Sequence, residues 1–283
     1  MSIILTGFSD EVHPDFGRQL AVFDGCGVKA IEIRGVDGRG ILGYTPAEAE
    51  KLKKQLDDRG MHVSSIGSPI GKIGINDDFE EHFRQFENAV ELCGVFGTPN
   101  MRIFSYYLPA GEADKYEDEV MRRTERLLGL ARSRGVVLLH ENEKGIYGDT
   151  APRCLKLMRR FAGENFRAVF DFANFVQCSQ DTLEAYELLA PYISYIHIKD
   201  AMKADGRVVP AGWGDGNVKE ILAALKAAGY AGYLSLEPHL TDFTGFAQLE
   251  RGGKAEKAVL DGESAFRIAL DSLKALLWEL DWH

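Results

Sequence analysis

Basic residues are in short supply in this sequence, which argues against one large class of partner. Lys and Arg together number 33, against 43 Asp and Glu, so the 283-residue chain has a formal net charge of −10. A chain of this charge repels the phosphate backbone of nucleic acids. We therefore expect no nucleic-acid partner.

Cysteines and long apolar runs are also scarce. None of the four cysteines forms a C-x-x-C pair or stands at zinc-finger spacing from a histidine. Free thiols are typical of a reducing compartment. No apolar run approaches the roughly 20 residues that span a bilayer, and the opening segment lacks the basic region of a signal peptide. We expect a cytoplasmic protein without a membrane partner.

Short apolar runs and helical patterns alternate eight times along the chain. A continuous apolar run is typical of a strand that is covered on both faces, as in a parallel sheet. The helical patterns have clear limits: Thr45, Pro46 and Glu48 predict a capped start, and Gly60 a stop. The predicted strands are Ile3–Phe8, Ala30–Ile33, His62–Ile66, Asn100–Phe104, Val136–His140, Arg167–Phe170, Ile193–Ile196 and Tyr233–Leu236.

Eight such units without a linker predict an α/β fold, a single (β/α)8 TIM barrel over residues 1–283. An open doubly wound sheet is the alternative, but its usual G-x-G-x-x-G motif is missing after the first strand. The pattern places His82 at the surface and Leu183, Tyr186 and Leu189 on the buried face of the sixth helix. Long loops are expected at 201–217 and 239–257.

Polar residues stand at the ends of the last four predicted strands, and they are the most informative feature of the sequence. These residues are Glu141, Asp171, His197 and Glu237. In a barrel they share one rim and can converge on one point. Three carboxylates so close together repel one another, and a divalent cation removes the conflict. Although a single acid after a strand is commonly a helix cap, four in succession predict one metal ion, Mn²⁺ or Mg²⁺, with Co²⁺ or Zn²⁺ as alternatives.

Motifs around these four residues resemble those of the sugar phosphate isomerase/epimerase family of xylose isomerase-like barrels. The motifs are HENE at Glu141, FDFANF from Asp171, HIKD from His197, PAGWGDGNV in the following loop and LSLEPH around Glu237. The resemblance covers essentially the whole chain. It implies that the four residues hold the metal, and that Glu141 and Glu237 also transfer protons.

Such chemistry fits isomerisation or epimerisation of a ketose, a ketose phosphate or a related polyol. One carboxylate removes the proton next to a carbonyl, which gives an enediolate, and the other returns a proton. The family's ketose epimerases often carry a histidine where this chain has Asn174, which we expect at the substrate. They also often carry an arginine after the seventh strand, where Lys203 and Arg207 are the candidates.

Further side chains at the same rim could bind substrate. Arg34, Lys72, Arg102 and Lys199 could form a wall that binds a phosphate or carboxylate. Alternatively, they form ion pairs with acids in the barrel mouth. Trp213, which stands between glycines, is either a lid residue or part of a turn.

Other functions remain open at this point. A lyase that dehydrates a keto-polyol would begin with the same proton abstraction and then expel a hydroxyl. A metal-dependent endonuclease is disfavoured by the net charge and by the single histidine among the ligands. A barrel that binds a sugar without catalysis, or that self-associates as a homo-oligomer, is compatible with the same sequence.

Overall fold

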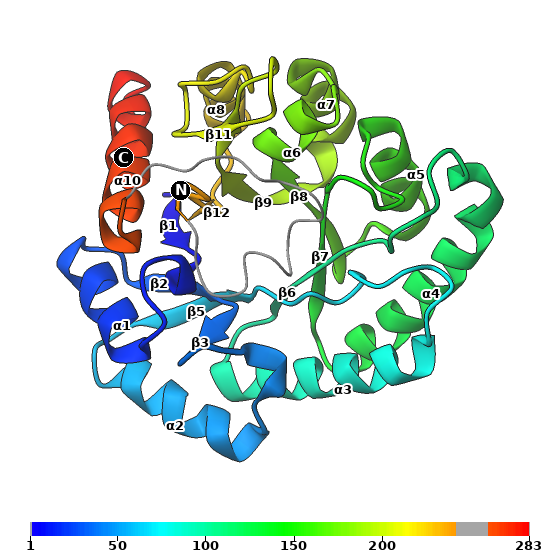
Figure 1. The fold of residues 1–283 in the computed structure, drawn as a ribbon, viewed down its shortest axis with the longest axis horizontal. Coiled ribbons are helices and arrows are strands. Elements are labelled where there is room, and N and C mark those ends of the chain that lie inside the picture. Colours follow the sequence, from blue (N-terminus) through cyan, green and yellow to red (C-terminus); the bar gives the residue numbers. More distant parts are fainter. Residues whose placement is uncertain (1, 242–259, 283) are drawn as a thin grey trace.

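The computed structural model describes residues 2–241 and 260–282. Its centre is a ring of eight parallel strands with helices on the outside (Figure 1). The eight strands are β1 (Ile4–Gly7), β2 (Ala30–Ile33), β5 (His62–Ile66), β6 (Asn100–Ile103), β7 (Val137–Glu141), β8 (Phe166–Asp171), β9 (Ile193–Ile198) and β12 (Tyr233–Leu236). Two short antiparallel ribbons pair β3 (Gly35–Val36) with β4 (Arg39–Gly40), and β10 (Asp200–Ala201) with β11 (Val208–Val209).

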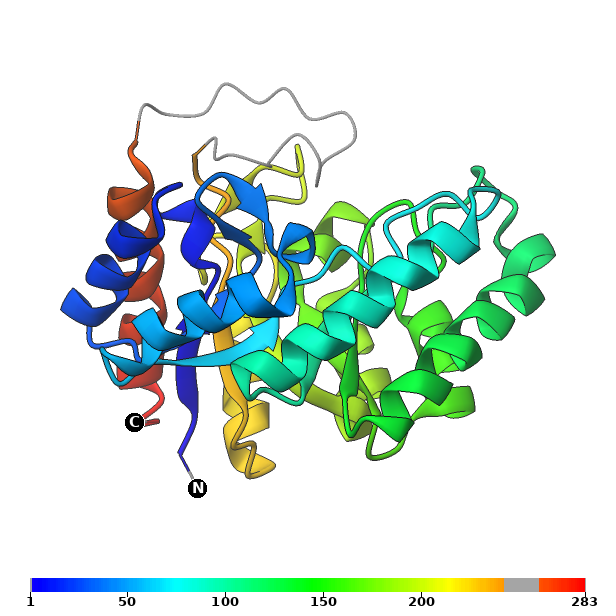
Figure 2. The ribbon, with the colours of Figure 1, turned by 90° about the horizontal axis from the view of Figure 1, so that it is seen from below.

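The strands follow the order β1-β12-β9-β8-β7-β6-β5-β2 around the sheet. A parallel bridge between Phe8, next to β1, and Glu32 of β2 joins the two ends. The sheet is therefore a nearly closed barrel, and the predicted (β/α)8 architecture is confirmed. The start of β1 and the end of α10 lie at the same side of the barrel, at the amino-terminal ends of the strands (Figure 2).

The helices begin and end where local sequence signals place them. The side chain of Thr45 accepts a hydrogen bond from the backbone N–H of Glu48, and the Glu48 carboxylate accepts one from Thr45 N–H, which confirms the predicted capping box. The helices are α1 (Phe16–Gly25), α2 (Pro46–Asp57), α3 (Phe79–Phe96), α4 (Ala113–Ser133), α5 (Ala151–Phe161), α6 (Phe172–Gln177), α7 (Thr182–Leu189), α8 (Val218–Ala227) and α10 (Gly262–Glu279).

Two side chains of the helical layer do not lie where the sequence pattern placed them. His82 is buried, because the loop after β5 covers it and the N–H of Gly71 donates a hydrogen bond to its Nε2 atom over 2.7 Å. Leu183 is 41% exposed, because the short helix α7 packs through Ala185 and Leu189 instead. Both predictions were wrong.

The long loops lie at the carboxyl ends of the strands. Residues 201–217 form one of them, with β11 inside it. The other predicted loop is described only as far as Thr241, and the rest of 239–257 lies outside the described residues. Within the described residues, no helix is long and apolar enough to cross a membrane.

Candidate metal centre

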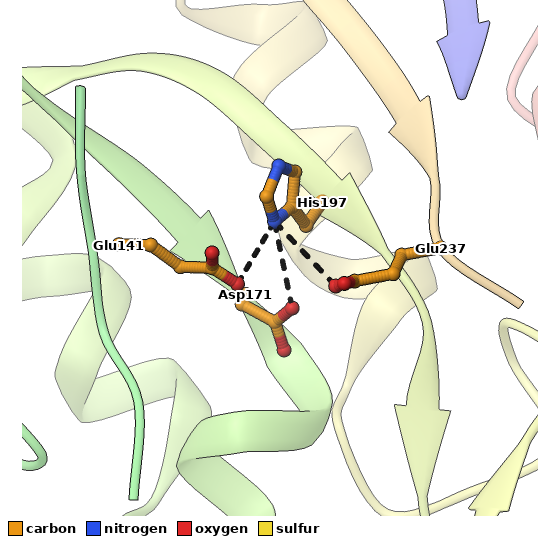
Figure 3. Close-up of side chains that lie close together, drawn as sticks. All are labelled: Glu141, Asp171, His197 and Glu237. Carbon is orange, nitrogen blue, oxygen red and sulfur yellow. Dashed lines mark hydrogen bonds and ion pairs between the residues drawn. The ribbon is translucent and has the colours of Figure 1, made fainter. Parts of the chain in front are cut away.

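The four polar residues predicted at the strand ends meet at one point. Glu141 ends β7, Asp171 ends β8, His197 lies next to the end of β9, and Glu237 directly follows β12. All four side chains are buried, and one ligand atom from each lies within 4.8 Å of the others. Glu141 and Glu237 approach from opposite sides, with His197 and Asp171 between them (Figure 3).

The imidazole of His197 is oriented by contacts on both of its nitrogens. Its Nδ1 atom faces the centre, 2.9 Å from Glu141 Oε1, 3.6 Å from Glu237 Oε2 and 3.8 Å from Asp171 Oδ2. Its Nε2 atom lies 3.2 Å from Oε2 of Glu32, a fully buried residue on β2. Nδ1 is therefore the atom that a metal ion at this centre would meet.

Burial and charge act in opposite directions on the three carboxyl groups. Burial raises the pKa of Asp171 to about 8, because Lys199 only partly offsets it and Glu141 and Glu237 add repulsion. Burial would also raise the pKa of Glu141, but the positive charges of His197 and Arg102 outweigh it and hold that pKa at about 2. The three carboxyl groups thus compete for the cations that surround them.

The donor set fits a divalent cation. Glu141 Oε2 and Asp171 Oδ2 are buried and accept no hydrogen bond from the described residues, although Arg102 and Lys199 lie 3.3 and 3.2 Å away. Buried oxygens without donors are uncommon in proteins and call for an explanation such as an ion. Three carboxylates and one imidazole suit Mn²⁺, Mg²⁺ or Zn²⁺.

Two asparagines form hydrogen bonds with residues of the centre, Asn174 with the side chain of Glu141 and Asn142 with the backbone of Asp171. The Nδ2 group of Asn174 donates to Glu141 Oε1 over 3.2 Å and to the carbonyl of Asn142 over 2.9 Å. The Asn142 side chain contacts both the N–H and the carbonyl of Asp171, each over 3.0 Å. Such contacts fix the orientation of metal ligands.

A small cavity borders the centre at Glu141 and Glu237. Four of the six predicted substrate-binding residues line it: Lys72, Arg102, Asn174 and Lys199. The other lining residues are Glu141, Glu143, Lys144, Glu237 and His239.

Arg34 and Trp213, the other two predicted substrate contacts, lie elsewhere. Arg34 stands behind Glu237, with 3.2 Å between its Nη1 atom and Oε1 of Glu237, and it also forms ion pairs with Asp10 and Glu11. Trp213 is 70% exposed on the loop before α8. Neither is among the residues that line the cavity.

Asp200 is a structural residue that the sequence reasoning missed. Its buried carboxylate accepts hydrogen bonds from four backbone N–H groups, those of Ala201, Gly216, Gly214 and Gly212, over 2.8, 2.9, 3.0 and 3.1 Å. The signal was present as three glycines at every second position after the HIKD motif. Asp200 thereby fixes the loop that follows β11.

Two curated proteins and one solved structure illustrate what the chain is similar to. A 3-dehydroshikimate dehydratase of Bacillus anthracis is 22% identical over 63% of this chain and 64% of its own length, less than two thirds of that relative. A 2-epi-5-epi-valiolone 7-phosphate 2-epimerase of Actinoplanes sp. is 24% identical over 69% and 71%. The crystal structure of the IOLI protein with a bound zinc atom superposes with a TM-score of 0.78 at 16% identity, over 98% of this chain and 99% of that one.

The extent of the family match settles the wider relationship. Residues 21–274, which are most of the chain, match the family described as xylose isomerase-like TIM barrel. The eight parallel strands and the surrounding helices agree with that match. The chain belongs to the xylose isomerase-like TIM barrel family.

Proposed function

We propose that the protein holds one divalent metal ion, with Mn²⁺ as the preferred metal, and that it isomerises or epimerises a polyhydroxylated ketone. One observation carries the proposal: Glu141 and Glu237 approach the centre from opposite sides, with Asp171 and His197 between them (Figure 3). Two carboxylates that face each other across one substrate position suit removal of a proton on one side and its return on the other.

The four strand-end residues would hold the metal through three carboxylate oxygens and Nδ1 of His197. When bound, the metal would supply a Lewis acid that acidifies the hydrogen next to a chelated carbonyl and stabilises the enediolate. Zinc in one structural relative supports a metal in this kind of barrel.

The side chains around Glu141 and Glu237 keep both carboxylates ionised. Arg102 lies between the two, with its Nη1 atom 3.3 Å from Glu141 Oε2 and 3.8 Å from Glu237 Oε1. Lys199 Nζ lies 2.7 Å from Glu237 Oε2. These cations favour the ionised carboxylate, which is the form a base requires. Both carboxylates line the same small cavity.

A dehydratase that uses the same centre is the second candidate. Lys199 is buried, lines the cavity and contacts both Asp171 and Glu237. A buried ammonium group at this position is suited to stabilise the negative charge that develops on a leaving hydroxyl after the first proton abstraction. A dehydratase is also among the relatives. Formation of a product that has lost water, in place of an isomer, would favour this candidate.

The first test is metal content followed by hydrogen exchange. Purified protein should contain one metal ion per chain, and Asp171→Ala should lose it. The metal-loaded protein should then exchange the hydrogen next to the carbonyl of a ketose with deuterium from the solvent. If the purified protein bound no added Mn²⁺, the proposed metal centre and the reaction that depends on it would both be contradicted.

A further inference from the structure

We infer that the guanidinium of Arg34 occupies a second cation position beside the metal centre and thereby positions Glu237. The side chains of Glu11, Glu237 and His239 form this position, and one ligand atom from each lies within 4.8 Å of the others. Glu237 also belongs to the metal centre, so the two cation positions share it. The consequence for proton transfer by Glu237 rests on the proposed function.

The guanidinium of Arg34 contacts three buried carboxylates. Its Nε atom donates to Oδ2 of Asp10 over 2.9 Å. Its Nη2 atom donates to Oε1 of Glu11 over 3.1 Å, and its Nη1 atom to Oε1 of Glu237 over 3.2 Å. The side chain is only 8% exposed, and its Cζ atom lies 4.3 Å from the centre of the Phe8 ring. Because each nitrogen meets a different carboxylate, the guanidinium has a fixed place and orientation.

His239 lies at the same two glutamate oxygens as Arg34. Its Nε2 atom is 3.3 Å from Oε1 of Glu11 and 3.3 Å from Oε1 of Glu237. Its backbone N–H donates to Oε2 of Glu11 over 2.7 Å, and its φ of 48° lies in the left-handed region. Such backbone conformations cost free energy and cluster at functional sites. Glu11 thus binds both the guanidinium of Arg34 and the segment that follows β12.

Electrostatics favour a single cation in this position. A divalent ion bound there would lie at short range from the guanidinium and would be repelled by it. Displacing Arg34 would leave a buried charge without its partners, which is strongly unfavourable. Without the guanidinium, however, Asp10, Glu11 and Glu237 would lose a common counter-charge and repel one another. We therefore expect the wild type to bind one metal ion, and a variant without the Arg34 charge to bind a second.

Arg34 assigns the two oxygens of Glu237 to different partners. Oε1 faces Arg34 and His239, at 3.2 and 3.3 Å. Oε2 faces the metal centre, 2.7 Å from Nζ of Lys199 and 3.6 Å from Nδ1 of His197. Because Arg34 holds Oε1, the carboxylate is restrained from turning, and Oε2 stays where the proposed reaction requires it.

Titration of the metal-free full chain with Mn²⁺ tests the occupancy. Calorimetry should find one Mn²⁺ per chain in the wild type and two in Arg34→Ala. Guanidinium chloride, below the concentrations that unfold the protein, should compete with the second ion. Adding Glu11→Gln to Arg34→Ala should weaken the second ion about tenfold or more, because it removes a charged ligand. Arg59→Ala, at an exposed position after α2, is the control and should bind one ion.

A single Mn²⁺ in Arg34→Ala, bound with the wild-type affinity, would overturn the inference. Arg34→Lys provides a second test, because an ammonium group keeps the charge but cannot repeat the three contacts. At saturating Mn²⁺ it should exchange the hydrogen of D-ribulose or D-fructose about tenfold more slowly than the wild type, with a smaller change in KM. Exchange at the wild-type rate would also overturn the inference.

The same experiments separate the inference from the proposed function. Wild-type protein that binds one Mn²⁺ but exchanges neither ketose would contradict the proposed function. A second ion in Arg34→Ala would still support Arg34 as the resident cation, because Mn²⁺ stoichiometry is measured without any substrate.

Discussion

Glu32 and His197 form a buried contact across the barrel, with 3.2 Å between Oε2 of Glu32 and Nε2 of His197. The same Glu32 oxygen accepts a hydrogen bond from the Ser235 hydroxyl over 2.6 Å. If Glu32 accepts from Nε2–H, a metal ion that displaces the proton from Nδ1 would meet the lone pair of that nitrogen. A carboxylate behind a ligand histidine generally fixes the tautomer and strengthens the ligand.

Replacing Glu32 should therefore weaken the metal centre without touching a ligand. In Glu32→Gln we expect the affinity for Mn²⁺ to fall by about 10–100-fold, the usual effect of losing such a partner. Titration calorimetry on the metal-free protein measures it. Asp58→Asn, at the exposed residue that follows α2, is the control and should bind as the wild type does. Equal affinity in wild type and Glu32→Gln would mean that the contact does not support the ligand.

The buried His82 should make folding stability depend on pH. Burial, with a smaller contribution from the charge of Arg123, lowers its pKa from 6.5 to about 4. The unfolded chain therefore binds more protons between these values, and stability falls as the pH falls through this range. Between pH 7 and pH 5 the loss from His82 should be about 2 kcal/mol.

Urea unfolding at the two pH values measures this loss. His82→Gln keeps an acceptor for Gly71 N–H but cannot be protonated, so its stability should differ less between pH 7 and pH 5 than that of the wild type. His62→Gln, at an exposed position, should retain the full difference. A His82→Gln protein with the wild-type pH dependence would show that other groups are responsible.

The fold could be predicted because its signals are local. A short apolar run marks each strand, and a helical spacing of apolar residues with a capping residue marks many of the helices. The strands Ala30–Ile33, His62–Ile66 and Tyr233–Leu236 were therefore predicted with the bounds that the structure has. His82 was misplaced because its burial comes from the loop at Gly71, not from its own helix. The periodicity of a helix cannot show what a distant loop covers.

The sequence predicted the four residues that meet at the centre, but not the residues that support them. Its four acidic and histidine side chains each end or follow a strand, so counting strands brings them together. The contact between Glu32 and His197 joins residues 165 positions apart and depends on how β2 faces β9 across the barrel. The role of the Asp200 carboxylate could not be predicted either, because a sequence does not show which anion a series of glycine N–H groups will bind.

Asp200 should contribute measurably to stability. Asp200→Asn replaces one acceptor oxygen by an amide donor, which then faces backbone N–H groups that have no other described partner in the loop. We expect a loss of about 1–3 kcal/mol in the free energy of unfolding, the cost of leaving buried groups unsatisfied. Urea unfolding measures it, and Asp205→Asn, at an exposed position, should be neutral. An unchanged Asp200→Asn protein would show that the loop does not depend on this carboxylate.

Asp171 and Glu237 should separate metal binding from proton transfer. Asp171 has no proton-transfer role in the proposal, so Asp171→Ala should lose metal affinity and hydrogen exchange together. Glu237→Gln keeps a neutral oxygen ligand, and it should lose exchange more completely than it loses metal, by about 10²-fold or more in rate. Mn²⁺ affinity and deuterium uptake at saturating Mn²⁺ are measured on both proteins. If Glu237→Gln at saturating metal exchanged hydrogen at the wild-type rate, Glu237 would be a ligand alone, and Glu141 would have to both remove and return the proton.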